Sequence, residues 1–158
     1  MVLFVFLFEI FCSQMAWSAE VQFEGYYRLE LDSKPIGYAI QRYELDAKDK
    51  IIRAASFVKT NELGGNLQES LKAEAKTKEN SEFEPVSFQY TGQSGKNLKS
   101  IDAVFKKGIM ELLKTDGKKK AIKETYKIPA GTFLSTFAGY LMLQNGMSVG
   151  KKFVYSAV

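Results

Sequence analysis

The stretch FEGYYRLELDSKPIGYAIQRYEL, residues 23–45, decides the fold class of this chain. From Phe23 to Leu31 every second residue is apolar or glycine, and the residues between them are mostly charged. This period of two predicts a β-strand with one face toward the core and one toward water. SKPIG then predicts a turn in which Pro35 fixes φ, and residues 36–45 continue as a second strand. The two strands are expected to form a hairpin.

The same signals continue downstream. Five further segments are predicted as strands with tight turns between them, and Asp116-Gly117 is a strong hairpin signal: residues 51–59, 85–92, 97–107, 109–116 and 119–128. Residues 66–80, NLQESLKAEAKTKEN, are ambiguous, because Leu67, Leu71 and Ala75 fit one face of either a helix or a strand. Their alanine, glutamate and lysine favour a helix by propensity. Their position between hairpins favours a strand, which is our prediction.

Residues 128–150, IPAGTFLSTFAGYLMLQNGMSVG, contain no charged residue. Thr132 is predicted to cap a helix of about three turns over residues 133–143, and Asn145-Gly146 predict its end. The apolar run is too short for a membrane span, which needs about 20 residues. The fold is therefore predicted to be mainly β: a large curved antiparallel sheet, an open half-barrel of about eight or nine strands, with one C-terminal helix packed on it.

Four apolar side chains cluster on one side of the predicted helix: Phe133, Phe137, Tyr140 and Leu141. Two interpretations fit this cluster. The helix either completes the core, or it lines a cavity against the sheet that accepts an acyl chain or another apolar ligand. The same residues serve both roles, so the sequence does not separate them. We take these four as candidate ligand-binding residues.

Residues 1–19 are typical of a secretory signal peptide. An apolar run at residues 2–8 is followed by the small residues Ala16 and Ser18, so cleavage near Ser18-Ala19 is expected. No lysine or arginine precedes the run, which leaves an uncleaved anchor in the inner membrane as the alternative. Residues 20–158 are predicted to form a single β-rich domain that is periplasmic or secreted.

The residue types that the chain lacks restrict its chemistry. It has no histidine, and its one cysteine, Cys12, lies in the predicted signal peptide. The mature chain therefore excludes Ser-His-Asp and Cys-His catalysis and histidine-based zinc sites, and we expect neither an enzyme nor a cofactor or metal. A hydrolase that uses only carboxylates stays open, although carboxylates on alternating strands usually face solvent. Its candidate residues are Glu30, Glu44, Asp102 and Glu111.

The positive charge of the chain does not point to nucleic acid. Loss of residues 1–19 removes one acidic residue, Glu9, so the mature charge is 22 − 17, or +5. Lysine supplies most of this charge, and the arginines are Arg28, Arg42 and Arg53. The dense cluster at residues 118–120 follows an aspartate and is predicted to be a solvated turn rather than a phosphate-binding patch.

Three motifs resemble a family of exported bacterial domains of unknown function: GYYRLELDSKPIGYAIQRYEL, FEPVSFQYTG and GYLMLQNGMSVGKKF. The similarity covers most of residues 25–153. It implies a curved antiparallel sheet, distantly like the periplasmic lipoprotein-carrier half-barrels. Domains of this kind also precede transglutaminase-like cysteine peptidase domains in longer envelope proteins. The resemblance carries no functional residues over to this chain.

These observations lead to an expected function and an alternative. The chain is expected to be a non-catalytic exported envelope module that binds a partner protein or an apolar ligand in a cavity between sheet and helix. The alternative is the structural N-terminal domain of a larger transglutaminase-like cell-envelope protein. The last residues, GKKFVYSAV, begin a strand at Lys151 that either pairs with an earlier strand or continues into a missing C-terminal part.

Overall fold

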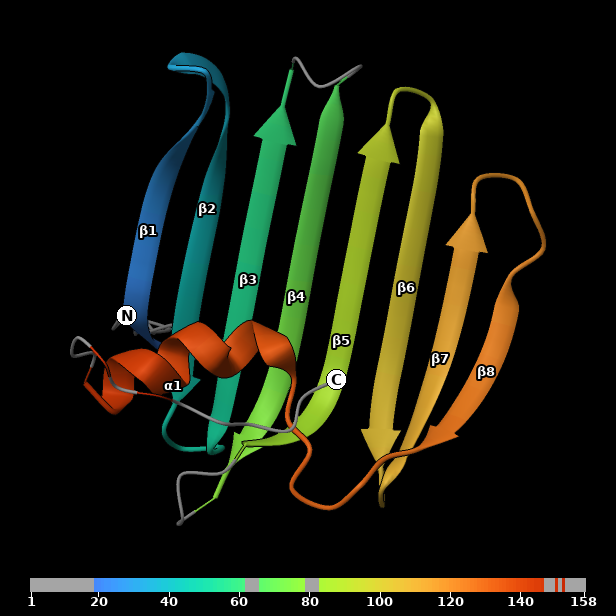
Figure 1. Cartoon of the computed structure of the whole chain (residues 1–158). Helices are drawn as coiled ribbons and strands as arrows, with labels where there is room; N and C mark the ends of the chain where they lie inside the picture. The colour runs from blue at the N-terminus through green and yellow to red at the C-terminus, as the bar shows by residue number, and fades with distance from the viewer. Residues whose placement is uncertain (1–18, 62–65, 79–82, 147–149, 151, 153–158) are drawn as a thin grey trace, which may run out of the picture.

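The computed structural model describes residues 19–61, 66–78, 83–146, 150 and 152. The predicted signal peptide, apart from Ala19, and nearly all of the predicted last strand lie outside these residues. The described part contains eight strands, a short 3-10 segment and one α-helix (Figure 1): β1 (Ala19–Leu31), β2 (Lys34–Asp46), β3 (Ile51–Thr60), β4 (Leu67–Thr77), β5 (Phe83–Ser94), β6 (Asn97–Lys106), β7 (Ile109–Asp116), β8 (Ile122–Lys127), η1 (Ser135–Phe137) and α1 (Ala138–Gln144).

The eight strands form one antiparallel sheet in sequence order, from β1 to β8. Each strand pairs with the next one along the chain, so every connection joins neighbours. Within the described residues β1 and β8 lie at opposite edges and the sheet does not close on itself (Figure 1). The predicted fold class, a large open antiparallel sheet with one C-terminal helix, is therefore confirmed.

The first hairpin is present, but its turn differs from the prediction. Asp32 and Ser33 both have positive φ, 49° and 62°, which is the pattern of a two-residue type I′ turn. Pro35 lies inside β2, opposite Glu30, so its predicted place in the turn is wrong. A two-residue turn with this twist matches the twist of the strands, whereas a wider SKPIG turn would splay them.

The ambiguous segment is a strand, as predicted. β4 pairs over its whole length with β3 on one side and β5 on the other. Its Ala73 and Ala75 are buried. The hydrogen bonds and burial gained in the middle of a sheet outweigh the helix propensity of alanine, glutamate and lysine.

The helical segment begins later than predicted. Leu134 is extended, with φ −78° and ψ 127°, and the 3-10 turn starts only at Ser135. Thr132 is therefore not the N-cap. It is buried at the end of a turn, in which its amide donates a hydrogen bond of 3.4 Å to the carbonyl of Pro129. The predicted end is confirmed: Asn145 is the C-cap and Gly146 follows with φ 69°. No helix in the described part of the chain is long and apolar enough to cross a membrane.

The core lies between one face of the sheet and α1. Figure 1 shows the helix crossing the lower part of the sheet, in front of β2 and β3. We call this side the helix face and the opposite side the open face. The strands contribute both small and large residues to this core: Ala54, Ala73, Ala75 and Ala103, and Tyr43, Ile52, Phe83, Phe105 and Leu112. The segment that ends in α1 contributes large residues: Phe133, Leu134, Phe137, Tyr140 and Leu141. The small side chains of the alanines leave room for these large ones, so the two sides fill the core together.

Candidate functional site

The four predicted ligand-binding residues form the contact between helix and sheet. Their exposed fractions are 6%, 0%, 5% and 7% for Phe133, Phe137, Tyr140 and Leu141. The structure therefore brings all four together on the side that the sequence predicted. All of them are covered by neighbouring side chains, and their role in binding a ligand stays a prediction.

An aromatic stack fills the space beneath the helix. The ring of Tyr140 lies 5.4 Å from Tyr43 and 6.0 Å from Phe83, and the Phe137 ring stands edge-on to Phe83 at 5.6 Å. The hydroxyl of Tyr43 donates a hydrogen bond of 2.9 Å to the carbonyl of Thr136, which ties β2 to the helical segment. The hydroxyl of Tyr140 accepts a hydrogen bond of 2.9 Å from the side-chain amide of Gln144. Burial raises the pKa of the Tyr43 and Tyr140 hydroxyls, so both stay neutral at ordinary pH.

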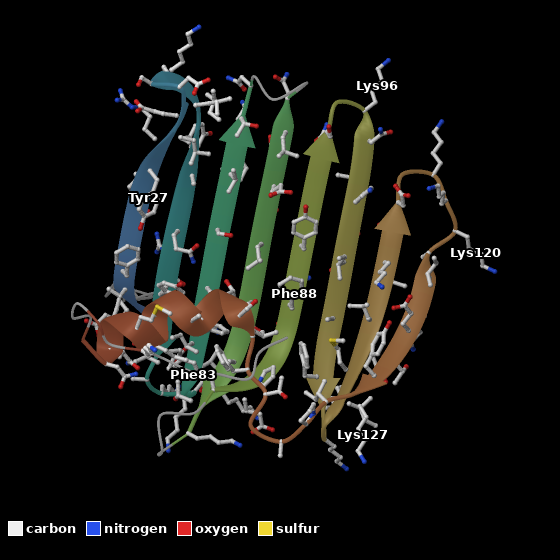
Figure 2. The ribbon with its side chains drawn as sticks, viewed as in Figure 1. Tyr27, Phe83, Phe88, Lys96, Lys120 and Lys127 are labelled. Atoms are coloured by element: carbon white, nitrogen blue, oxygen red, sulfur yellow. The ribbon has the colours of Figure 1, made fainter. Side chains whose placement is uncertain are left out.

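A pocket of about 430 Å³ adjoins this stack at the end of the sheet. We call it the lysine-rimmed pocket. Its apolar lining is Phe83, Pro85, Phe105, Ile128 and Pro129, and its charged lining is Lys78, Lys106, Lys107, Lys127 and Glu84. Figure 2 shows Phe83 and Lys127 at the same end of the sheet. Because Phe83 also contacts Phe137 and Tyr140, the floor of this pocket is continuous with the aromatic stack.

The rim of this pocket carries excess positive charge. Four lysines and one glutamate give a net charge of 4 − 1, or +3. Lys78 lies 3.6 Å from Glu84, whereas Lys106, Lys107 and Lys127 form no salt bridge within the described ranges. An anion at this rim would meet exposed lysine ammonium groups, with the buried ring of Phe83 beneath it.

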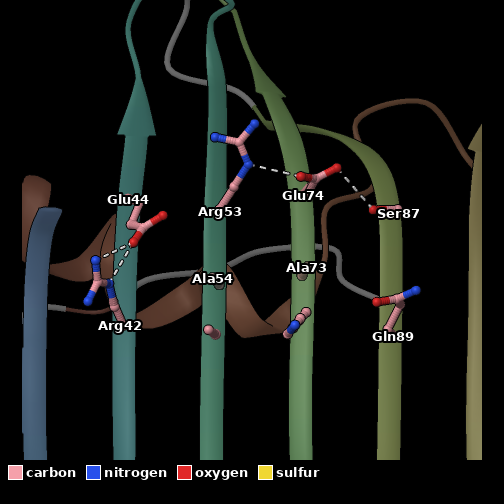
Figure 3. Close-up of a pocket in the computed structure, with 10 residues that line it drawn as sticks. Arg42, Glu44, Arg53, Ala54, Ala73, Glu74, Ser87 and Gln89 are labelled. Carbon is pink, nitrogen blue, oxygen red and sulfur yellow. Dashed lines mark hydrogen bonds and ion pairs between the residues drawn. The ribbon is translucent and has the colours of Figure 1, made fainter. Parts of the chain in front are cut away.

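A second pocket, of about 390 Å³, lies on the open face and involves β2 to β5. Figure 3 views it from the side on which the helix lies behind the strands. We call it the arginine pocket. Its polar lining comes from Arg42, Glu44, Arg53, Lys72, Glu74, Ser87 and Gln89.

Ion pairs order the two arginines of this pocket. Nε of Arg42 donates to Oε1 of Glu44 at 2.6 Å, and Nε of Arg53 donates to Oε1 of Glu74 at 2.9 Å. The hydroxyl of Ser87 donates to the other oxygen of Glu74 at 3.3 Å. Each guanidinium is thus held in a fixed orientation along the strands, as the dashed lines in Figure 3 show.

The four carboxylates named as hydrolase candidates do not converge. Glu44 lies in the arginine pocket on β2, and Asp102 lies on β6, so three strands separate them, or about 19 Å across the sheet. Glu30 and Glu111 lie on the edge strand β1 and on β7 and form salt bridges there with other residues. No group of three or more metal-ligating side chains occurs among the residues that the structure describes.

Neither pocket was predicted from the sequence. The sequence does contain a signal for the arginine pocket: Arg42 and Glu44 are two residues apart, so they lie on the same face of a strand. The lysine-rimmed pocket had no such signal, because its four lysines come from three separate segments of the chain. Comparisons of the chain with protein-family models, with curated proteins and with solved structures give no match.

Proposed function

We propose that this chain is a non-catalytic module of the cell envelope that binds a small amphipathic anion in the lysine-rimmed pocket. One observation carries the proposal: a single pocket combines an aromatic floor with three lysines that form no salt bridge in the described part of the chain. An apolar body would lie on Phe83 and Phe105, and an anionic group would face the lysines. The predicted export signal supports the location.

The physical balance favours such a ligand over a purely apolar one. An acyl chain that lies on the floor would gain about 25 cal/mol for each Å² of apolar surface removed from water, before the cost of association. The lysines are exposed, so each adds at most about 1 kcal/mol and loses it at high salt. The floor therefore supplies affinity, and the rim selects the sign of the charge. Contact with Phe83 also brings the ligand beside Phe137 and Tyr140, two of the candidate residues.

Calorimetric titration with three ten-carbon probes tests this proposal: decanoate, decanol and decyltrimethylammonium, all below their micelle concentrations. We expect decanoate to bind best and the ammonium probe worst. Lys127→Glu should weaken decanoate about fivefold to tenfold and leave decanol unchanged. Lys120→Glu is the matched control, because Lys120 is an exposed lysine next to the other end of β8, as Figure 2 shows. Equal binding of the anionic and cationic probes would contradict the proposal.

One observation favours the alternative, a structural N-terminal domain of a larger transglutaminase-like envelope protein. Phe137 has no exposed surface, so the space under the helix is occupied by the protein's own side chains. A purely structural domain would bind none of the three probes. The same titration therefore separates the two proposals.

A further inference from the structure

A row of side chains across the open face leads from an exposed tyrosine into a small pocket. The row consists of direct cross-strand partners on consecutive strands from β2 to β5: Tyr38, Lys59, Gln68 and Gln93. Tyr38 is four residues from Arg42 along β2, so the row faces the same side as the arginine pocket. A pocket of about 230 Å³, which we call the carboxamide pocket, is lined by Lys59, Asn66, Leu67, Gln68, Gln93 and Gly95.

The lining of the carboxamide pocket is rich in amides and carries little charge. Asn66, Gln68 and Gln93 are exposed, and each side chain has two N–H donors and a carbonyl acceptor. Nε2 of Gln93 donates to the carbonyl of Gly95 at 3.1 Å, which uses one donor and orients the amide. Among the described residues of the lining, Lys59 is the one charged side chain. These groups match neutral hydroxyl groups, because a hydroxyl also both donates and accepts.

An aromatic pair borders this pocket on β2 and β3. The rings of Tyr38 and Phe57 lie 5.9 Å apart with an interplanar angle of 39°, and Tyr38 is 44% exposed. Phe57 is two residues from Lys59, so both side chains are on the open face. Tyr38 and Gln68 are two strand spacings apart, or about 10 Å. A ligand of two or three sugar rings can therefore contact the tyrosine ring and the amides together.

The size and charge of this surface distinguish between classes of ligand. The pocket is smaller than the about 300–1,000 Å³ of a drug-sized site, so it holds one small ring. Single-stranded nucleic acid needs a groove lined by many cations, and a stable protein interface needs about 800 Å² on each partner around an apolar core. The lining instead combines three amides with one lysine. A neutral sugar fits it best, because a pyranose has an apolar C–H face for an aromatic ring and hydroxyl groups for the amides.

We propose that the carboxamide pocket and the ring of Tyr38 form a binding site for a neutral oligosaccharide of β-linked glucose-type rings. One ring lies in the pocket, where its hydroxyl groups bond to the amides of Gln68 and Gln93. The next ring packs its C–H face on Tyr38. Figure 2 shows Lys96, which follows Gly95, at the opposite end of the sheet from Phe83 and Lys127. The site is therefore independent of the lysine-rimmed pocket and of the function proposed for it.

NMR titration of the full chain tests this site with three probes: cellotetraose, sorbitol and D-glucuronate. We expect cellotetraose to shift the side-chain amide signals of Gln68 and Gln93 in a saturable way. The signal of Gln89 should not move, because Gln89 is exposed on the same face of β5 but lies outside the carboxamide pocket. Sorbitol has hydroxyl groups but no ring, so it should shift none of them. Three results would overturn the proposal: no shift with cellotetraose up to about 20 mM, equal shifts with sorbitol, or shifts with glucuronate alone, which would indicate an anion at Lys59.

Substitutions at Tyr38 and Gln68 test the two halves of the site. Tyr38→Ala should weaken cellotetraose about fivefold to tenfold, and Tyr38→Phe should keep most of the affinity, because it keeps the ring. Gln68→Ala should weaken it about threefold to tenfold. Tyr27→Ala is the matched control: Tyr27 is 49% exposed, but it pairs with Ala39, the neighbour of Tyr38, so it faces the opposite side. Equal weakening by the Tyr38→Ala and Tyr27→Ala variants would refute a specific site.

Discussion

Replacing Phe137 by alanine tests whether the helix is held by a filled core. Phe137 has no exposed surface, and its ring stands edge-on to Phe83 at 5.6 Å. Truncating a buried phenylalanine to alanine costs about 3–5 kcal/mol, because the apolar surface is lost and a cavity remains. The edge-to-face pair accounts for about 0.5–1.5 kcal/mol of this. The expected loss is a large share of the roughly 5–15 kcal/mol that stabilises a typical domain.

The assay must separate release of the helix from unfolding of the sheet. The Phe137 ring joins a short helical segment to the sheet, so its loss can free the segment while the strands stay paired. Hydrogen exchange measures both events, because each 1.4 kcal/mol lowers protection about tenfold. We expect amides of α1 to lose protection by about two to three orders of magnitude in the Phe137→Ala variant. Urea unfolding then shows whether β3 and β4 are affected to the same degree.

A control and a refuting result complete this test. Leu143 lies in the same helix but is 44% exposed, so Leu143→Ala should cost no more than about 0.5 kcal/mol. A loss below about 1 kcal/mol for Phe137→Ala would refute a filled core. It would mean that the space around the ring is already empty or easily deformed, as expected for a ligand cavity. Rescue of the variant by benzene would support the filled-core interpretation, because a new apolar cavity binds such a molecule.

Three further substitutions test local features of the fold. Gly37→Ala would place a methyl group 2.0 Å from the backbone carbonyl oxygen of Lys59, so β2 and β3 must separate, and urea unfolding should show a loss of at least about 1–3 kcal/mol; an unchanged midpoint would contradict this packing. Tyr43→Phe removes the hydrogen bond to the helical segment and should cost about 0.5–1.5 kcal/mol by the same measurement, whereas a neutral result would show that the bond adds nothing. The hydrogen bond from Lys114 lowers the pKa of Glu124 below its ordinary value of 4.5. The stabilisation that the Glu124 carboxylate gains from Lys114 is therefore fully present above pH 4.5, and it is lost as the pH falls through the lowered pKa of Glu124 in the folded state. The wild type should be more stable than Lys114→Met at pH 7, and the difference should shrink toward pH 3; a constant difference would refute the linkage.

Much of the fold follows from local patterns, and the exceptions have physical reasons. The period of two in residues 23–45 predicts the first hairpin, because one face of that sheet must be buried. The start of the helix was misplaced because Thr132 has the right residue type for a cap. The tertiary structure instead buries Phe133 and Leu134 in an extended segment against the sheet, and the helix can begin only after them.

The pockets could not be predicted because they depend on register. Arg42 and Lys72 come together only because Arg42 pairs with Ala55, and Ala55 pairs with Lys72. A slip of one residue in either pairing would move one of these side chains to the other face. The predicted SKPIG turn left the register of the first hairpin undefined, and two bulges in the pairing of β1 with β2 have no clear sequence signal.

The ion pairs of the open face are explained by the needs of the sheet itself. An antiparallel sheet with one face in water needs polar side chains there, and alternating ion pairs such as Arg53 with Glu74 meet that need. Pairs of this exposure contribute little stability, about 0–1 kcal/mol each, so they account for solubility without any ligand. Lys72 adds a charge that no described neighbour balances, and its removal should not affect folding.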